Sequence, residues 1–394
     1  MFLPAWVAGQ EIPPPNERLV VSAEGAIRVT TAVPSAAETR EIFGARLYNR
    51  NVQPVWIKIE NLGDEPLWFL PVGLDDAYFT PIETSSRAQG RARELDASIN
   101  KEFYANGMRL RIAPGETHSG YVFSRVDEGT KSFNVDVLGA DENHFMTFFV
   151  PVPGLRIDHR QLDWTSLYRE DEFVDVDING LVAGLEELPC CVTDRRGRNN
   201  GDPLNIALVG EIRDVYYAFL RAGWDETETI YTRSLLGMAK SALSGSEYRY
   251  SPVSALYVYG RAQDVALQKA RSNIDQRNHL RLWLTPMRYE GSPVWIGQIS
   301  RDIGVRLTRK TITTHKIDPD VDETREYLLE DLAYAQSLAG VGYVRGVGMA
   351  PYDEPRGNLT GDPYFTDGLR VVLFISGEPV DIAELELIDL GARP

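Results

Sequence analysis

The chain of 394 residues is poor in residues that cross-link a fold or bind transition metals. Its two cysteines, Cys190 and Cys191, are adjacent, so a disulfide between them cannot join distant segments. We expect both thiols to be free at a loop, with a vicinal disulfide as the alternative in an oxidising compartment. No Cys-x-x-Cys motif or Cys/His spacing accompanies them, so the cysteines do not predict a zinc site.

Lysine is also scarce: it occurs at only seven positions, and the formal charge of the chain is −16 at pH 7. Proteins that bind nucleic acids or anionic membranes broadly need a face with an excess of lysine and arginine. Only Arg195, Arg196 and Arg198 form a basic cluster, and their glycine and asparagine neighbours favour a solvated loop. The sequence therefore predicts no nucleic-acid partner.

Long apolar runs are missing as well. None approaches the roughly 18 residues of a bilayer-spanning helix, so no transmembrane segment is predicted in this chain. The chain begins with apolar residues up to Gly9 and turns polar from Glu11, which resembles the end of a secretory signal without its charged start. We expect a peripheral protein of the cell envelope or periplasm, with the cytoplasm as the alternative.

What is present indicates two domains of different periodicity. Beyond a tail or signal remnant at 1–17, residues 18–153 contain short alternating strands such as Pro54–Glu60 and Ser132–Val137. They predict an immunoglobulin-like antiparallel β-sandwich, with a charged helical stretch near 85–103 that crosses between the sheets. Strand aromatics such as Trp56, Trp68 and Phe69 are interpreted as core residues in preference to a binding surface. Residues 154–201 are interpreted as an acidic linker.

From 202 to 394 the pattern changes to an α/β domain, so the fold class is α+β overall. Apolar periodicity predicts a strand at 204–209, a helix at 211–222, paired strands at 279–284 and 293–299, a helix at 320–338, and closing strands at 343–347 and 369–375. This order suggests a split βαβ, ferredoxin-like sheet with an insertion, and an open α/β sheet of another order is the alternative.

Several short segments of this second domain have a family resemblance. Asp202-Pro-Leu-Asn205, His279-Leu-Arg-Leu-Trp283, Pro293-Val-Trp-Ile-Gly297 and Thr314-His315 occur in an order and spacing that resemble the LssY carboxy-terminal domain family over about residues 188–350. Members are frequently attached to membrane segments of the DedA and phosphatidic-acid-phosphatase types. The phosphatase motifs are absent from this sequence, so the resemblance implies no membrane phosphatase activity. Relatives often have a second histidine where this chain has Lys316, which weakens a two-histidine metal site.

Polar residues at strand ends and in one loop are the candidates for chemistry. His279 and Arg281 share a strand face, Asp302 follows the next strand, and His315 precedes an aspartate-rich loop. The candidate catalytic residues are His279, His315, Asp318 and Asp320, and the candidate substrate-binding residues are Arg261, Arg281, Asp302 and Arg325. The simplest structural interpretation of Asp318-Pro-Asp320 is a turn followed by a helix cap.

Three interpretations of these residues stay open. His279, His315 and an aspartate could bind one divalent metal while an arginine holds a phosphoryl group; His315 could act as a general acid or base without metal; or the residues form a structural network or an anion pocket. The leading hypothesis is an accessory or binding module of the bacterial envelope, with an envelope or membrane protein as partner. The alternative is a metal-dependent or His/Asp hydrolase of a phosphorylated or lipid-linked substrate. The sequence assigns no cofactor.

Overall fold

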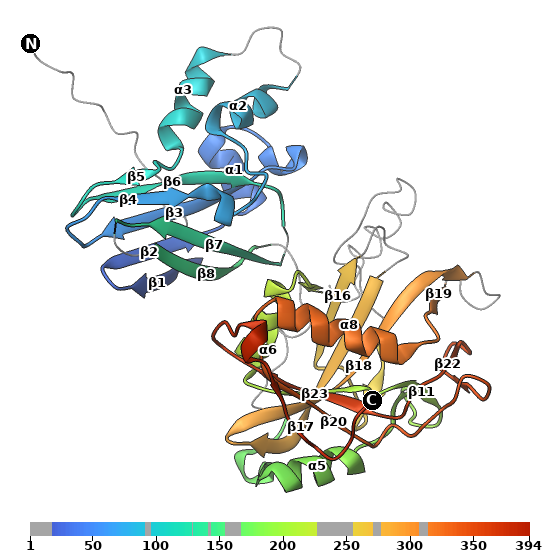
Figure 1. Cartoon of the computed structure of the whole chain (residues 1–394). Coiled ribbons are helices and arrows are strands. Elements are labelled where there is room, and N and C mark those ends of the chain that lie inside the picture. The colour runs from blue at the N-terminus through green and yellow to red at the C-terminus, as the bar shows by residue number, and fades with distance from the viewer. Residues whose placement is uncertain are drawn as a thin grey trace, which may run out of the picture. The chain divides into compact units, whose positions relative to one another are not determined.

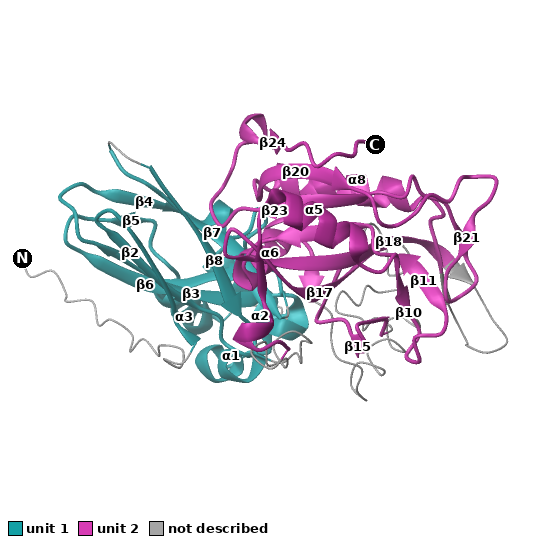
Figure 2. Cartoon of the chain, turned by 90° about the horizontal axis from the view of Figure 1, so that it is seen from below, with its two compact units in different colours: residues 1–155 teal, residues 156–394 magenta. Residues whose placement is uncertain are grey.

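A computed structural model describes residues 18–90, 96–127, 129–140, 143–153, 167–226, 255–270, 277–306 and 314–394. The chain divides into two compact units, residues 1–155 and 156–394 (Figure 2). No described helix is long and apolar enough to cross a membrane. The two units differ in architecture, and each is described by itself.

Two four-stranded antiparallel sheets form the first unit. One has the order β1 (Val20–Glu24), β2 (Ile27–Ala32), β3 (Gln53–Asn61) and β6 (Thr117–Ser124). The other has the order β5 (Arg111–Ile112), β4 (Leu67–Leu70), β7 (Thr130–Leu138) and β8 (Asn143–Pro151). Alternate residues of both sheets, such as Ile57 and Val135, are fully buried in one core between them. This arrangement confirms the predicted sandwich (Figure 1).

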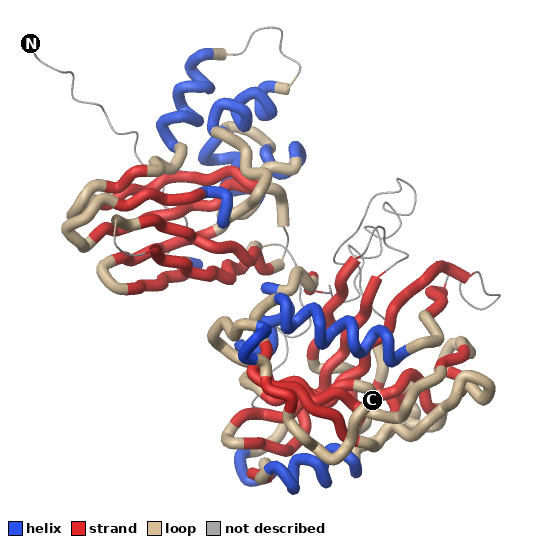
Figure 3. Tube along the Cα trace, in the orientation of Figure 1, coloured by secondary structure: helices blue, strands red, loops and turns tan. Residues whose placement is uncertain are grey.

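Three α-helices cover the outer face of the first sheet. α1 (Ala36–Phe43), α2 (Pro81–Gln89) and α3 (Ala97–Asn106) gather on that side of the unit (Figure 3). Phe43 and Phe103 from α1 and α3 pack there with Trp56 and Tyr121 of the sheet. The helical stretch predicted near 85–103 therefore exists as α2 and α3, but it covers a sheet face. Trp56 and Phe69 are core residues as predicted, whereas Trp68 is 41% exposed.

The second unit contains a ten-stranded mixed sheet. Its main path is β13 (Asp225–Glu226), β16 (Val265–Ala270), β17 (Arg277–Tyr289), β18 (Ser292–Arg306), β12 (Ile206–Val209), β23 (Arg370–Ile375), β20 (Leu338–Val344) and β24 (Glu386–Leu387). β19 (Thr314–Ile317) and β9 (Val174–Val176) pair with β18 and β17. Four predicted strands correspond to β12, β17, β18 and β23, whereas the strand predicted at 343–347 is β20 at Leu338–Val344, because the preceding helix ends at Tyr334 and not at 338. The sheet has more strands and another order than the ferredoxin-like arrangement, which is not confirmed.

The central hairpin follows the prediction closely. β17 and β18 are antiparallel, with Leu282 opposite Gly297 and Leu284 opposite Trp295. Glu290 and Gly291 at the turn both have positive φ, as a tight hairpin turn of matching twist requires. The hairpin therefore provides long, regular strands on which side chains alternate between the two faces of the sheet.

Helices lie on both faces of this sheet. α8 (Val321–Tyr334) packs against β18, β20 and β23, and Asp320 caps it by accepting a hydrogen bond from the Glu323 amide. α5 (Ile178–Glu187) contacts β17 and β20 on the other face, where Leu181 and Leu185 pack with Trp283. α6 (Ile212–Arg221) contacts β23. Figure 1 shows α5 and α8 on opposite sides of the strands.

Smaller strands complete the unit. β10 (Cys191–Thr193), β11 (Asn200–Pro203), β14 (Tyr257–Val258) and β15 (Arg261–Ala262) make a separate four-stranded sheet, and β21 (Arg356–Gly357) pairs with β22 (Pro363–Tyr364). The stretch assigned from sequence to an acidic linker supplies β9, α5 and β10. It therefore contributes both a helix and strands to the second unit.

Arg370 fastens the end of α5 to the sheet. Its side chain is fully buried on β23, and Nε donates to the Leu204 carbonyl at 2.8 Å. The other guanidinium nitrogens donate to the carbonyls of Leu185, Leu188 and Pro189, which close the helix. A cation suits the carbonyl end of a helix. Burial lowers the pKa of Arg370 to about 10, so the side chain stays charged at neutral pH.

Arg370→Met should lower the free energy of unfolding by about 3 kcal/mol, because several buried carbonyls lose their donor while side-chain volume is largely kept. Urea unfolding of the full chain followed by circular dichroism measures this change. The control Arg345→Met removes an exposed arginine and should change stability by less than about 0.5 kcal/mol. Equal effects of the two substitutions would contradict the assigned role.

Candidate functional site

One face of the β17–β18 hairpin changes from apolar to polar along its length. His279, Arg281 and Trp283 alternate onto the α5 face of β17, and Gln298 and Ser300 lie opposite Arg281 and His279 on β18. Trp283 belongs to the apolar core under α5, whereas the positions farther from the turn carry charge. The strand alternation thus places ionisable side chains inside the fold.

His279 and Asp302 form a buried pair. Nε2 of His279 lies 2.7 Å from Oδ2 of Asp302, and both residues are less than a tenth exposed. Burial lowers the pKa of His279 to about 4, although the Asp302 carboxylate opposes this shift. Arg277 and Arg281 add to the lowering through their positive charges. The imidazole is therefore neutral at pH 7.

Arg281 lies between two carboxylates. It donates to Oε1 of Gln298 at 2.9 Å, and Asp202 and Asp302 attract its charge. Burial lowers the pKa of Arg281 and raises that of Asp202, since each charge is removed from water. Asp202 comes from β11, which packs against β18. We call these residues the polar core: Asp202, His279, Arg281, Gln298 and Asp302.

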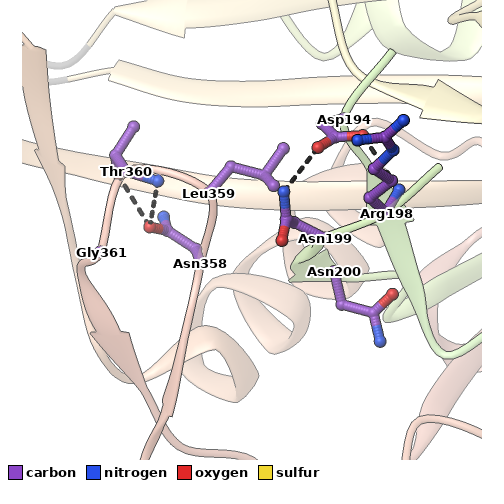
Figure 4. A pocket seen from close by; sticks show the side chains of 8 residues that line it. All are labelled: Asp194, Arg198, Asn199, Asn200, Asn358, Leu359, Thr360 and Gly361. Carbon is purple, nitrogen blue, oxygen red and sulfur yellow. Dashed lines mark hydrogen bonds between the residues drawn. The ribbon is translucent and has the colours of Figure 1, made fainter. Parts of the chain in front are cut away.

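A surface pocket of about 750 Å³ lies between two loops of the second unit (Figure 4). Its walls are the loop at 194–200, between β10 and β11, and the turn at 358–361, between β21 and β22. The lining side chains are mainly amides, a hydroxyl and one guanidinium: Asp194, Arg198, Asn199, Asn200, Asn358, Leu359, Thr360 and Gly361. The pocket is thus polar and open to solvent.

In each wall, one side chain accepts several hydrogen bonds from its own loop. Asp194 accepts from the amides of Arg196 and Arg198 and from Nδ2 of Asn199. These bonds lower the pKa of Asp194, the backbone bond from Arg198 most of all. In the other wall, Oδ1 of Asn358 accepts from the Thr360 amide and hydroxyl and from the Asp362 amide. The pocket is therefore preformed.

Asn358 connects the pocket to the polar core. Its Nδ2 donates to Oδ1 of Asp202 at 3.0 Å, while its Oδ1 holds the turn. Asp202 in turn faces Arg281. One amide side chain therefore links a pocket wall to a buried carboxylate of the polar core.

The cysteines lie beside the same walls. They form a vicinal disulfide, which corrects the expectation of free thiols. Sγ of Cys191 is 3.9 Å from the Tyr364 hydroxyl on β22, and Nδ2 of Asn200 is 3.9 Å from Sγ of Cys190. The pair therefore contacts β22 and a residue that lines the pocket.

Three of the predicted residues are brought together, namely His279, Arg281 and Asp302. Two others have the structural roles of a turn and a cap: Oδ1 of Asp318 accepts from the Asp320 amide, and Asp320 caps α8. Both carboxylates therefore lie at the start of α8, where one stabilises the turn and the other caps the helix.

Two of the predicted substrate-binding arginines form ion pairs with neighbouring aspartates. Arg261 donates to both carboxylate oxygens of Asp264 and to the Leu284 carbonyl, and Tyr168 also receives a bond from it. Arg325 is fully buried in α8 and makes a two-pronged ion pair with Asp367. Each arginine thereby joins segments of the fold.

The two histidines of the shared-metal hypothesis belong to different strands of the sheet. No group of three His, Cys, Asp or Glu residues that could hold a metal occurs in the part of the chain that the structure describes. The His315 backbone lies in β19 opposite Val305, whereas His279 is opposite Ser300. Five residues of β18 separate these positions, about 17 Å of extended strand. The His315 side chain lies outside the described residues.

Sequence reasoning missed the contribution of Asn358 and the two roles in the Asp202–Asn205 motif. Asp202 belongs to the polar core, while Asn205 donates to the Ile299 and Val321 carbonyls and so ties β18 to α8. The available signal is the sequence Asn358-Leu-Thr-Gly-Asp362, because asparagine side chains at turns bond to nearby backbone amides.

The stability contribution of His279 should depend on pH. The neutral imidazole stabilises the fold fully above the unfolded pKa of 6.5, and this contribution is lost as pH falls toward the folded value of about 4. Each pH unit in this window corresponds to about 1.4 kcal/mol at most. His279→Gln should flatten the dependence in urea unfolding between pH 7 and 4. The control His118→Gln, in the first unit, should leave the pH dependence of the free energy of unfolding unchanged. An unchanged pH dependence in the His279 variant would contradict the role assigned to His279.

Comparison with known families agrees with the resemblance found in the sequence. The family model described as LssY C-terminus matches residues 185–369. This range includes the polar core and both pocket walls. A comparison with curated proteins finds no match. Residues 185–369 therefore match the LssY C-terminus family, as the resemblance in the sequence indicated.

Proposed function

We propose that the second unit is a binding module of the bacterial cell envelope that holds an anionic, phosphoryl-type group in the pocket at 194–200 and 358–361. The observation that carries the proposal is the preformed polar pocket whose wall residue Asn358 is anchored on buried Asp202. A site that is ordered before binding loses less entropy when its ligand arrives. We further propose that the module works beside membrane lipid or transport machinery, with an envelope or membrane protein as partner.

The charge of the lining favours an anion. Arg198 lines the pocket and is exposed, and Arg195 and Arg196 extend from the same loop. A guanidinium offers planar paired donors that fit phosphate oxygens. Asp194, the one acid of the lining, already accepts three hydrogen bonds from its own loop. The amides of Asn199 and Asn200 add neutral donors.

Binding is favoured over hydrolysis by the state of His279. The buried His279–Asp302 pair has the arrangement of a general base with its orienting acid, which is the observation in favour of a hydrolase. A pKa of about 4, however, makes His279 a weak base at neutral pH. A ligand in the pocket contacts Asn358, while the polar core beneath it is almost fully buried.

The envelope location is supported by two features. Disulfides persist mainly in oxidising compartments, and the Cys190–Cys191 bond is of this type. The family resemblance adds the frequent attachment of such domains to membrane segments. Both features agree with a module that binds a phosphorylated envelope component, either free or as a lipid headgroup.

Calorimetric titration of the full chain should detect binding of glycerol phosphate and of inorganic phosphate, and vesicles containing phosphatidic acid distinguish a headgroup from a free ligand. Arg198→Ala should raise the Kd about tenfold, through loss of a charged hydrogen bond. The control Arg213→Ala removes an exposed arginine of α6 and should leave Kd unchanged. Absence of binding, or equal affinity of the Arg198 variant, would contradict the proposal.

Phosphate release from glycerol phosphate or phosphatidic acid separates the two functions. The binding proposal predicts no turnover. Release that disappears in His279→Gln, at unchanged ligand affinity, would establish the hydrolase instead, because only the reaction requires a base.

A further inference from the structure

The disulfide between Cys190 and Cys191 joins neighbouring residues where β10 begins. In the chain-entropy account, the stabilisation from a disulfide increases with the length of the chain loop that it closes. A bond between adjacent residues closes no such loop, so it adds little of the stability that structural disulfides provide. The chemistry of the bond is therefore the more informative property.

The two sulfurs differ in how well solvent reaches them. Cys190 is half-buried, whereas Cys191 is only 4% exposed. Reduction of a disulfide begins when an external thiolate attacks a sulfur that it can reach. Sγ of Cys190 is therefore the sulfur open to attack, and Cys191 is the leaving group.

Each sulfur has a hydrogen-bond donor beside it. The Tyr364 hydroxyl lies 3.9 Å from Sγ of Cys191, and Nδ2 of Asn200 lies 3.9 Å from Sγ of Cys190. Burial raises the pKa of Tyr364, so its hydroxyl keeps its proton at neutral pH. A donor stabilises the thiolate that forms when the S–S bond breaks, and a stabilised thiolate leaves faster. The surroundings of both sulfurs therefore favour reduction.

We propose that Cys190–Cys191 is a redox site, that a protein dithiol of the Cys-x-x-Cys kind reduces it, and that its state controls the order of the pocket at 194–200 and 358–361. The first thiolate of the reductant bonds to Sγ of Cys190 and displaces Cys191, which takes up a proton. The second thiol of the reductant then attacks the mixed disulfide and releases Cys190, which is also protonated. Two electrons and two protons pass to the chain, and the reductant becomes a disulfide.

Dense packing connects the pair to the pocket walls. Cys191 is opposite Pro203 in the pairing of β10 with β11. Gly201 of β11 lies tightly between β10 and the pocket turn, because a Cβ atom at this position would be 2.8 Å from Cγ of Leu359 and 3.0 Å from Cγ2 of Val192. When the bond breaks, the two sulfurs move apart to van der Waals contact. Neighbouring side chains must then shift, since a close-packed region has no free space.

The contacts of the two sulfurs lead to both walls. Asn200 lines the pocket, and Tyr364 is opposite Arg356 in the β21–β22 pair that carries the pocket turn. Reduction turns each sulfur into a thiol that can donate as well as accept, so both contacts change. We expect the oxidised chain to keep the walls ordered and the reduced chain to loosen them. The redox chemistry needs no ligand, whereas its control of ligand affinity rests on the proposed function.

Thiol counting tests the redox site on the folded full chain. The chain is treated with dithiothreitol or with a Cys-x-x-Cys protein, alkylated and weighed by mass spectrometry. Because the chain has two cysteines, each added group reports on this pair. Two groups are expected after treatment and none before it. Alkylation of the untreated chain, or reduction only after denaturation, would overturn the proposal.

A matched pair of tyrosine variants tests the donor. Tyr364→Phe should slow reduction of the folded chain several-fold, because it keeps the ring and removes the hydroxyl beside the Cys191 thiolate. The control Tyr352→Phe removes the hydroxyl of a 79% exposed tyrosine and should be reduced at the wild-type rate. Equal rates in the two variants would contradict the role of Tyr364.

Hydrogen exchange without ligand measures the effect on the pocket. Exchange in peptides covering 196–204 and 356–364 should be several-fold faster in the reduced chain, with α8 unchanged. The double variant Cys190→Ser/Cys191→Ser should show the fast exchange with and without dithiol. Equal exchange in the oxidised and reduced chains would overturn the control of the pocket by the disulfide.

Titration of both redox states with glycerol phosphate separates this inference from the proposed function. Reduction should raise the Kd about tenfold. If neither state binds the ligand while exchange responds to dithiol, the proposed function fails and the redox site stands. If both states bind equally, the control of ligand affinity is overturned and the proposed function stands.

Discussion

The second unit depends on burying opposite charges together inside a sheet. Arg281 has lost its water, and it stays in the fold because Asp202 and Asp302 compensate its charge. A buried charge deprived of its partner costs several kcal/mol, so these residues constrain one another's positions. β11, β17 and β18 must therefore keep their mutual arrangement. The pocket wall depends on the same arrangement, because the Asn358 side chain, which holds the surface turn, is hydrogen-bonded to Asp202.

The two units differ in which faces of their sheets are covered by helices. In the second unit, α5 and α8 lie on opposite faces, and Arg370 and Arg325 attach them through carbonyl and carboxylate contacts. In the sandwich, one sheet is covered by helices while the other keeps aromatic side chains in solvent. Covered faces provide stability, and the pocket is where the second unit can meet a ligand.

Much of the fold could be predicted because its signals are local. The β17–β18 hairpin, α6 and α8 follow from apolar periodicity, and the Asp320 cap follows from its sequence position. The strand order could not be predicted, since pairs such as β12–β23 join residues far apart in the chain. His279 and Asp302 could be predicted as neighbours because both lie in or next to adjacent strands. The role of Asn358 could not be predicted, because it depends on a contact with Asp202, more than 150 positions away in the chain.

The connection between polar core and pocket is the central claim, and hydrogen exchange measures it most directly. In the wild type, the amides of Thr360 and Asp362 are bonded to the Asn358 side chain. Asp202→Ala removes the anchor of that side chain. The account predicts faster exchange in peptides covering residues 356–364 of the variant, with α8 unchanged. Unaltered exchange in those peptides, in a variant that remains folded, would contradict it.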